Sequence, residues 1–125
     1  MINEFYSSLP KKIMKEVTTL EVKPPSEDCN KQIDDLLKRT VLLGGKRLRP
    51  LLTFLMGELF NVSTESLRQY ARAVELVHAA SLSHDDVIDD AQMRRGSPSI
   101  NVIGSNKKAI LTGDYLLADV IVHLT

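Results

Sequence analysis

Four aspartates lie within six consecutive residues, in the run SLSHDDVIDDAQMRRG, at the end of a long predicted helix. Side chains four residues apart share a helix face, so Asp85 and Asp89 should lie one above the other. Two carboxylates about 5–6 Å apart repel each other by roughly 3 kcal/mol at an effective dielectric constant of about 20. The negative potential of a helix C-terminus adds to this cost. A divalent cation such as magnesium, which takes carboxylate, water and phosphate oxygens, would relieve it.

An acidic cluster at a helix end can instead be a solvated surface, so its flanks matter. The cluster is followed by Arg94, Arg95 and Gly96, a cationic pair on a predicted loop. The residues before it are apolar or small, which indicates a largely buried helix: Val74, Leu76, Val77, Ala79, Ala80 and Leu82. Acidic groups followed by basic groups at the mouth of a buried helix favour a site for a metal-bound anion.

A second cluster, of opposite sign, lies in the run LLGGKRLRP. Lys46, Arg47 and Arg49 stand at the entry to a predicted helix, where the helix dipole already disfavours cations. An exposed basic loop would explain this pattern, and so would an anion bound at the helix start. The two clusters are complementary, because a metal-bound diphosphate would satisfy the first and a bare diphosphate the second.

His78 lies seven residues before Asp85, so His78, Leu82, Asp85 and Asp89 form one stripe along the predicted helix. A lone histidine in an apolar helix is usually a core residue bonded to the backbone. Its alignment with the acidic stripe favours a place in the site. His84 points about 100° away from Asp85, so we expect it to pack or bond elsewhere.

Composition excludes several classes of protein. The 125 residues suit one domain or part of one. Lys+Arg and Asp+Glu number 16 each, so no overall field attracts nucleic acid or an anionic membrane. Cys29 is the one cysteine, read here as an incidental thiol, which fits a reducing compartment. No signal peptide is evident, and charges interrupt the most apolar stretch, so no membrane span is expected.

Periodicity predicts an all-α chain with no convincing strand. The last predicted helix is apolar nearly all round, as helices inside a larger core are. We therefore expect residues 1–125 to be the N-terminal part of a single all-helical domain, unless a partner chain supplies the missing neighbours. Helices are predicted over 2–20 with a kink or break at Pro10, over 28–43 after a linker at 21–26, over 49–60, from about 64 to 89 or 90, and from 106 onward.

The motifs GGKRLRP, ELVHAASLSHDDVIDD, RRG and AILTGDYLLA, in this order and spacing, resemble those of the trans-polyprenyl diphosphate synthases. These are head-to-tail prenyltransferases of the isoprenoid synthase fold, and the resemblance covers about residues 40–120. It implies a helical bundle of that type, incomplete at its C-terminus, in a magnesium-dependent transferase that condenses isopentenyl diphosphate with an allylic diphosphate. It also implies a homodimer. Composition, as above, predicts a cytoplasmic protein with no nucleic-acid partner and no transmembrane segment.

The resemblance assigns one group of residues to isopentenyl diphosphate. Lys46 and Arg49 of the basic motif would bind it, with Arg47 alongside. His78 of the ELVH segment joins that site, and so does Arg95, the second arginine of RRG.

A second group is assigned to catalysis and to the allylic diphosphate. Asp85 and Asp89 would ligate magnesium, two or three ions in the complete enzyme, and Asp86 would support them. Arg94 would hold the allylic diphosphate. Ionisation of the allylic C–O bond, attack by the isopentenyl double bond and loss of a proton then follow.

One departure from the family pattern is a missing second aspartate-rich motif. Asp34 and Asp35 lie on the wrong side of the sequence, and Asp114 and Asp119 are isolated. We therefore predict that residues 1–125 alone are inactive as a synthase.

Product length should depend on the residues one to two turns before the aspartates. Ala80 and Ser81 are small, and Val77 lies one turn further back. Family members with short products often carry aromatic residues here, so we predict a product longer than farnesyl diphosphate.

Three alternatives remain at this stage. A terpene cyclase would use the same aspartates but has no need of the basic motif. A metal phosphohydrolase could use His84 with Asp85 but needs a further metal-binding histidine. A truncated or regulatory subunit would have little use for an intact aspartate motif.

Overall fold

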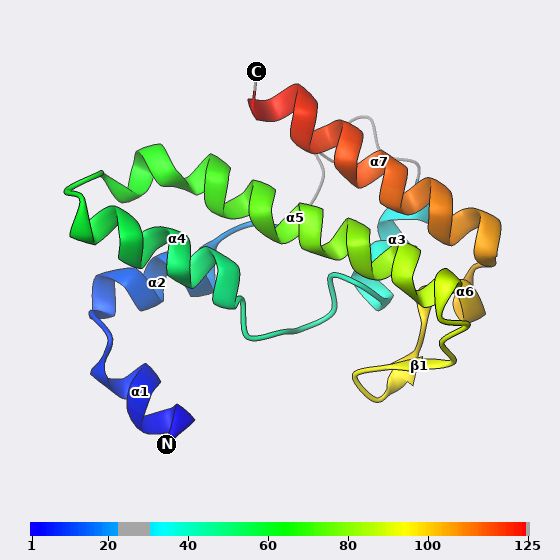
Figure 1. Ribbon diagram of the computed structural model, residues 1–125, viewed down its shortest axis with the longest axis horizontal. Coiled ribbons are helices and arrows are strands. Elements are labelled where there is room, and N and C mark those ends of the chain that lie inside the picture. Colours follow the sequence, from blue (N-terminus) through cyan, green and yellow to red (C-terminus); the bar gives the residue numbers. More distant parts are fainter. Residues whose placement is uncertain (23–30, 125) are drawn as a thin grey trace.

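The computed structural model describes residues 1–22 and 31–124, and they form an almost wholly α-helical structure. The longest helix, α5, lies between α4 on one side and α7 on the other (Figure 1). The elements in chain order are α1 (Ile2–Ser8), α2 (Lys11–Thr19), α3 (Lys31–Arg39), α4 (Leu48–Leu59), α5 (Thr64–Ile88), β1 (Met93–Arg94), β2 (Ser97–Pro98), α6 (Ile100–Ile103) and α7 (Asn106–Leu124). The prediction of an all-α chain is confirmed.

Helix α5 carries the core on two of its faces. Near its start, Ala71 packs with Leu51 and Phe54 of α4 and with Ile13 and Val17 of α2. Further along, α5 packs against α7 and the segment around α3, in a cluster of eight buried residues: Leu37, Val41, Ala73, Leu76, Ala79, Ala80, Leu116 and Val120. The inward residues of α7 recur every three or four positions, which is the spacing of one helix face.

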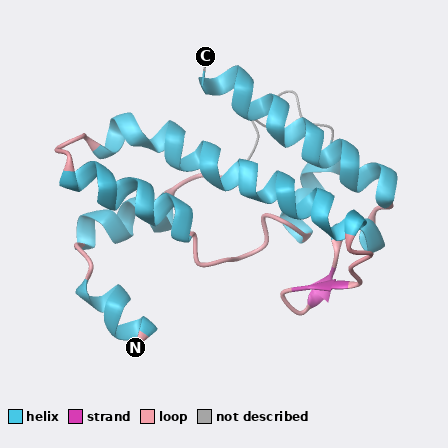
Figure 2. Cartoon of the chain, in the orientation of Figure 1, coloured by secondary structure: helices cyan, strands magenta, loops and turns pink. Residues whose placement is uncertain are grey.

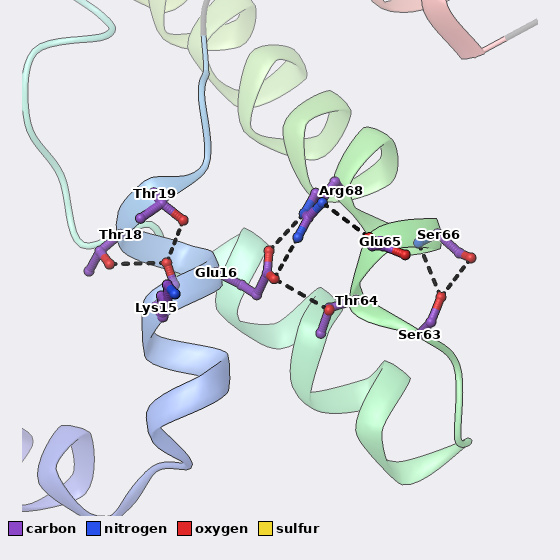
Figure 3. A network of polar contacts seen from close by, with 9 residues as sticks. All are labelled: Lys15, Glu16, Thr18, Thr19, Ser63, Thr64, Glu65, Ser66 and Arg68. Atoms are coloured by element: carbon purple, nitrogen blue, oxygen red, sulfur yellow. Dashed lines mark hydrogen bonds and ion pairs between the residues drawn. The ribbon is translucent and has the colours of Figure 1, made fainter.

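The first predicted helix is two helices, because Pro10 interrupts it as expected. Leu9 is extended, and Pro10 precedes α2 as its N-cap residue, where a missing backbone N–H costs nothing. Helix α2 is tied to α5 by Glu16, whose carboxylate accepts from Arg68 Nε at 2.9 Å and Nη2 at 2.8 Å (Figure 3). Arg68 is half exposed, so this pair adds little free energy but fixes where α2 lies.

Two short elements were not predicted from the sequence. Strands β1 and β2, of two residues each, form a short antiparallel hairpin (Figure 2), with Met93 opposite Pro98 and Arg94 opposite Ser97. Its turn residues, Arg95 and Gly96, both have positive φ, at 50° and 78°. Tight hairpin turns need such angles, and strands this short leave no periodic pattern to read. Helix α6, a single turn, was missed for the same reason.

Other boundaries agree with expectation to within a few residues. Ser63 is the N-cap of α5, and its Oγ accepts from the Ser66 N–H at 3.3 Å. The third described helix ends at Arg39 rather than at residue 43. The predicted start of that helix, most of the linker before it and Cys29 lie outside the described residues. Within the described part of the chain, no helix has the length and apolar character needed to cross a membrane.

Gly113 permits the close approach of α7 to α5. His84 Nε2 of α5 lies 3.1 Å from the Ile110 carbonyl oxygen and 3.3 Å from Asp114 Oδ1. A Cβ at position 113 would lie only 2.3 Å from that same nitrogen. His84 therefore bonds to α7, away from Asp85, as expected.

We predict that Gly113→Ala destabilises the fold even though alanine is the better helix former by about 1 kcal/mol. Overpacking against the imidazole should cost about 1–3 kcal/mol, so the thermal unfolding midpoint should fall. His84→Ala removes the clashing ring, and in that background the substitution should be neutral or stabilising. An equal loss in both backgrounds would contradict this account.

Candidate active site

A cationic cleft of about 640 Å³ collects residues from three separate segments. The loop before α4, the middle of α5 and the turn of the hairpin each contribute. Its lining consists of Gly45, Lys46, Arg47, Leu48, Arg49, Glu75, His78 and Arg95. These include all five residues that the resemblance assigned to isopentenyl diphosphate, although up to 49 positions separate them in the sequence (46 to 95).

Two of the arginines are held in place by backbone carbonyls. Arg47 has a left-handed backbone, with φ of 49°, and its Nη1 donates to the carbonyls of Leu20 and Val17 at the end of α2. Arg95 Nη1 donates to the Leu43 carbonyl at 3.2 Å. The same atom would lie 2.8 Å from a Cβ at position 45, so Gly45 makes room for it.

Two other cations of the cleft are left for a ligand. Within residues 1–22 and 31–124, the side chains of Lys46 and Arg49 form no hydrogen bond or ion pair, and both residues are exposed. Both lie at the start of α4, where the backbone N–H groups also attract anions. An anion bound here would accept hydrogen bonds both from these two side chains and from the backbone N–H groups at the start of α4.

His78 faces the cleft as a neutral imidazole. Burial lowers its pKa below the usual value, and the positive charges of Arg49, Arg95 and Arg94 lower it further, against an opposing effect of Glu75. A neutral ring can accept or donate one hydrogen bond without adding charge. A bound anion would raise this pKa by cancelling the neighbouring charge.

The four aspartates divide into exposed and buried members. Asp85, Asp89 and Asp90 are exposed, whereas Asp86 is 1% exposed. Asp86 Oδ1 accepts from Arg94 Nη2 at 2.6 Å and from Arg94 Nε at 2.9 Å. Within the described ranges, the carboxylates of Asp85 and Asp89 form no hydrogen bond or ion pair. Asp86 therefore fixes Arg94, while the other two stay available for a ligand.

Arg94 and Arg95 connect the acidic cluster with the cleft. The hydrogen bonds that Arg94 donates to Asp86 raise the pKa of Arg94, and the charges of Asp86, Asp85 and Asp89 raise it further. The charge of Arg94 also lowers the pKa of His78, and Arg95, the next residue, lines the cleft. The acidic and basic groups therefore lie on adjoining surfaces, joined by the hairpin.

Comparison with known proteins identifies the architecture. The family model described as "Polyprenyl synthetase" matches residues 30–125. The chain belongs to this family. Heptaprenyl diphosphate synthase component 2 of Geobacillus stearothermophilus is 51% identical over 75 residues, which are 60% of this chain and 23% of that protein. Farnesyl diphosphate synthase of Escherichia coli is 46% identical over 89 residues, 70% of this chain and 30% of that protein.

Solved structures of the polyprenyl synthetase family share this fold. A decaprenyl diphosphate synthase from Rhodobacter capsulatus matches with a TM-score of 0.79 and 34% identity, over 90% of this chain and 35% of that one. A polyprenyl synthase from Caulobacter crescentus, complexed with calcium and isoprenyl diphosphate, matches with a TM-score of 0.72 and 31% identity, over 90% and 33%. The predicted isoprenoid synthase type of bundle is confirmed. The chain spans a quarter to a third of these relatives.

The acidic end fits a magnesium ion in part. Across residues 1–22 and 31–124, no three His, Cys, Asp or Glu residues are grouped so as to hold a metal. Asp85 and Asp89 nevertheless offer two unpaired carboxylates, one turn apart on one helix face. Magnesium in a polyprenyl synthetase would need only one or two such ligands, because water and substrate phosphate complete its shell.

Of the three residues predicted to set product length, two line an apolar groove beside the cleft and the third does not. Val77 and Ser81 line it with His78 and residues of α4 and α7. Ala80 does not share this surface, since it is fully buried between α5 and α7. The neighbouring positions differ by about 100° around the helix, so only one of the two small residues faces the groove.

Glu75 is the cleft residue that our sequence reasoning missed. It lies one turn before His78, and this spacing on α5 was sufficient to place both on one face. The spacing was overlooked because a carboxylate is unexpected in a cleft that binds anions.

We predict that Asp86→Asn destabilises the chain by about 3 kcal/mol, because it leaves Arg94 with a much weaker partner in a mostly buried position. Chemical denaturation of the purified chain measures this. Asp90→Asn is the matched control: residue 90 is exposed with a left-handed backbone that asparagine tolerates. Equal stability of the two variants would show that the Asp86–Arg94 pair does not hold the hairpin.

Proposed function

We propose that this chain supplies the diphosphate-binding part of a trans-prenyltransferase, which joins isopentenyl diphosphate to an allylic diphosphate to make a chain longer than farnesyl. One observation carries the proposal: a single cleft gathers cationic residues of the loop before α4 and of the hairpin around His78 of α5, and it adjoins the exposed carboxylates of Asp85 and Asp89. An enzyme that handles two diphosphates needs both kinds of surface side by side.

Isopentenyl diphosphate is the proposed ligand of the cationic cleft. Lys46 and Arg49 supply free charged donors, and Arg95 and Arg47 are anchored beside them. The neutral His78 adds a hydrogen bond. No departing charge has to be stabilised here, because this diphosphate stays on the product, so fixed cations without a metal suffice.

The allylic diphosphate is the proposed ligand of the acidic end. Magnesium bound to Asp85 and Asp89 would neutralise the leaving diphosphate. Arg94 uses Nε and Nη2 for Asp86, so its Nη1 remains available for a phosphate oxygen. Asp86 would act here by holding that guanidinium in one orientation.

The reaction that we propose breaks the allylic C–O bond and forms a carbon–carbon bond to the isopentenyl double bond. A proton is then lost, with the released diphosphate as its acceptor. The chain's own residues hold the two substrates close together and keep water from the carbocation. The groove that Val77 and Ser81 line offers the growing tail an apolar surface.

We propose a homodimer in the cytoplasm, from family membership and from the single cysteine. Large apolar side chains exposed on α7 are consistent with further packing partners, among them Ile121 at 65% and Val122 at 68%.

The test of function is a chimera in which residues 1–125 replace the homologous segment of the Escherichia coli farnesyl diphosphate synthase. We expect chain elongation from an allylic diphosphate only when isopentenyl diphosphate is present. Replacing both Asp85 and Asp89 with Asn should lower the rate by at least about 100-fold, since metal-bound charge stabilisation is lost. Asp90→Asn is the control and should retain activity.

Three outcomes of this assay would contradict the proposal. Cyclic hydrocarbon formed without isopentenyl diphosphate would indicate a terpene cyclase. Phosphate release without elongation would indicate a phosphohydrolase. A folded chimera that binds neither substrate would indicate a non-catalytic segment.

The groove makes a separate prediction in the same chimera. Ser81→Phe should shorten the main product, because a ring there would fill the groove about one helical turn, roughly 5.4 Å, from the aspartates. Ala80→Phe should instead lower stability, since that side chain is enclosed by the core. Product analysis by chromatography decides, and an unchanged product from Ser81→Phe would exclude the groove as the path of the tail.

A further inference from the structure

The feature that our proposed function leaves unused is Glu75, a carboxylate in a cleft built for anions. It lines the cleft with Arg49 and His78, and its Oε2 is buried without a hydrogen-bond partner among the described residues. A buried charged oxygen without a partner is costly, and like charge beside a bound diphosphate would be costlier still. Its presence therefore calls for a compensating contact when the cleft is filled.

Arg49 is the cation best placed to provide that contact. Arg47 and Arg95 already donate to backbone carbonyls. Arg49 lines the cleft together with Glu75 and His78, and the charges of Arg49 and Glu75 both affect the pKa of His78. Arg49 also lines the apolar groove beside α5, which places it against the helix that carries Glu75.

We infer that Glu75 is a positioning residue, an inference that rests on the proposed function. When a diphosphate enters the cleft, the Glu75 carboxylate binds one edge of the Arg49 guanidinium. The other edge of that guanidinium then faces the phosphate. A guanidinium has five N–H donors in a planar fork, enough to serve two anionic partners at once. The carboxylate thereby limits the orientations of a long, exposed side chain. Glu75 acts through Arg49 and does not touch the reacting atoms.

The positioning role predicts a change in pyrophosphate affinity opposite to the one that simple charge repulsion predicts. A carboxylate that merely sits in the cleft repels pyrophosphate, so its neutralisation would tighten binding. A positioning carboxylate gives the opposite result. Glu75→Gln should weaken the binding of inorganic pyrophosphate about tenfold, the size of coupling common between contacting residues. It should leave the thermal midpoint of the unliganded chain unchanged or raised, because the unpaired buried charge is removed.

Isothermal titration of the 125-residue chain with inorganic pyrophosphate, in a chelator to exclude metal, measures these effects. Glu58→Gln, an exposed site on α4 that makes the same change in charge, is the matched control and should keep the wild-type affinity. Arg49→Ala provides the decisive background. There Glu75→Gln should no longer weaken binding, since the residue that it positions is gone.

Each outcome decides something. Tighter or unchanged binding by Glu75→Gln, or an equal loss with and without Arg49, would overturn the positioning role while leaving the cleft as an anion site. A lower thermal midpoint together with losses in both backgrounds would indicate a structural role instead. If the unsubstituted chain bound no pyrophosphate, the proposed cleft itself would be wrong, and this inference would fall with it.

Discussion

The ion pair between Asp86 and Arg94 is the interaction on which the site depends. It joins the end of α5 to the hairpin, and the turn of that hairpin carries Arg95 into the cationic cleft. The pair also explains why two adjacent arginines belong to adjoining surfaces of opposite charge. Arg94 is turned toward the aspartates, and Arg95, next in a turn with positive φ, is turned toward the loop before α4. The pair therefore helps to fix the spacing of the two charged surfaces, together with the bond from Arg95 to the Leu43 carbonyl.

The site places charged side chains at helix ends where the helix dipole opposes them. Cations stand at the start of α4, carboxylates stand at the end of α5, and both helix ends already carry potential of the same sign. Folding of helices alone does not favour such placement. The fixed members, Arg47, Arg95 and Asp86, are satisfied by the protein, whereas Lys46, Arg49, Asp85 and Asp89 are left to a ligand. This division between anchored and free groups suits the two diphosphates that we propose as ligands.

Sequence reasoning located both charged clusters but not the roles within them. Helical spacing predicted that Asp85 and Asp89 lie one turn apart, and the residues of the basic motif do line the cleft. The burial of Asp86 could have been predicted by extending the inward stripe of Leu76, Ala79 and Ser83 by one more step. The difference in burial between Ala80 and Ser81 could not have been predicted, because it depends on where α7 crosses α5. The hairpin was equally out of reach, since two-residue strands carry no period.

The most direct test is a crystal structure of the chain grown with pyrophosphate and Mn²⁺ in place of Mg²⁺, with the metal located by anomalous scattering. Our account predicts two pyrophosphates on adjoining surfaces. The one bound by Lys46, Arg49 and His78 should have no metal, and the one at Asp85 and Asp89 should carry Mn²⁺. Manganese at another position, or pyrophosphate absent from the cationic cleft, would contradict it.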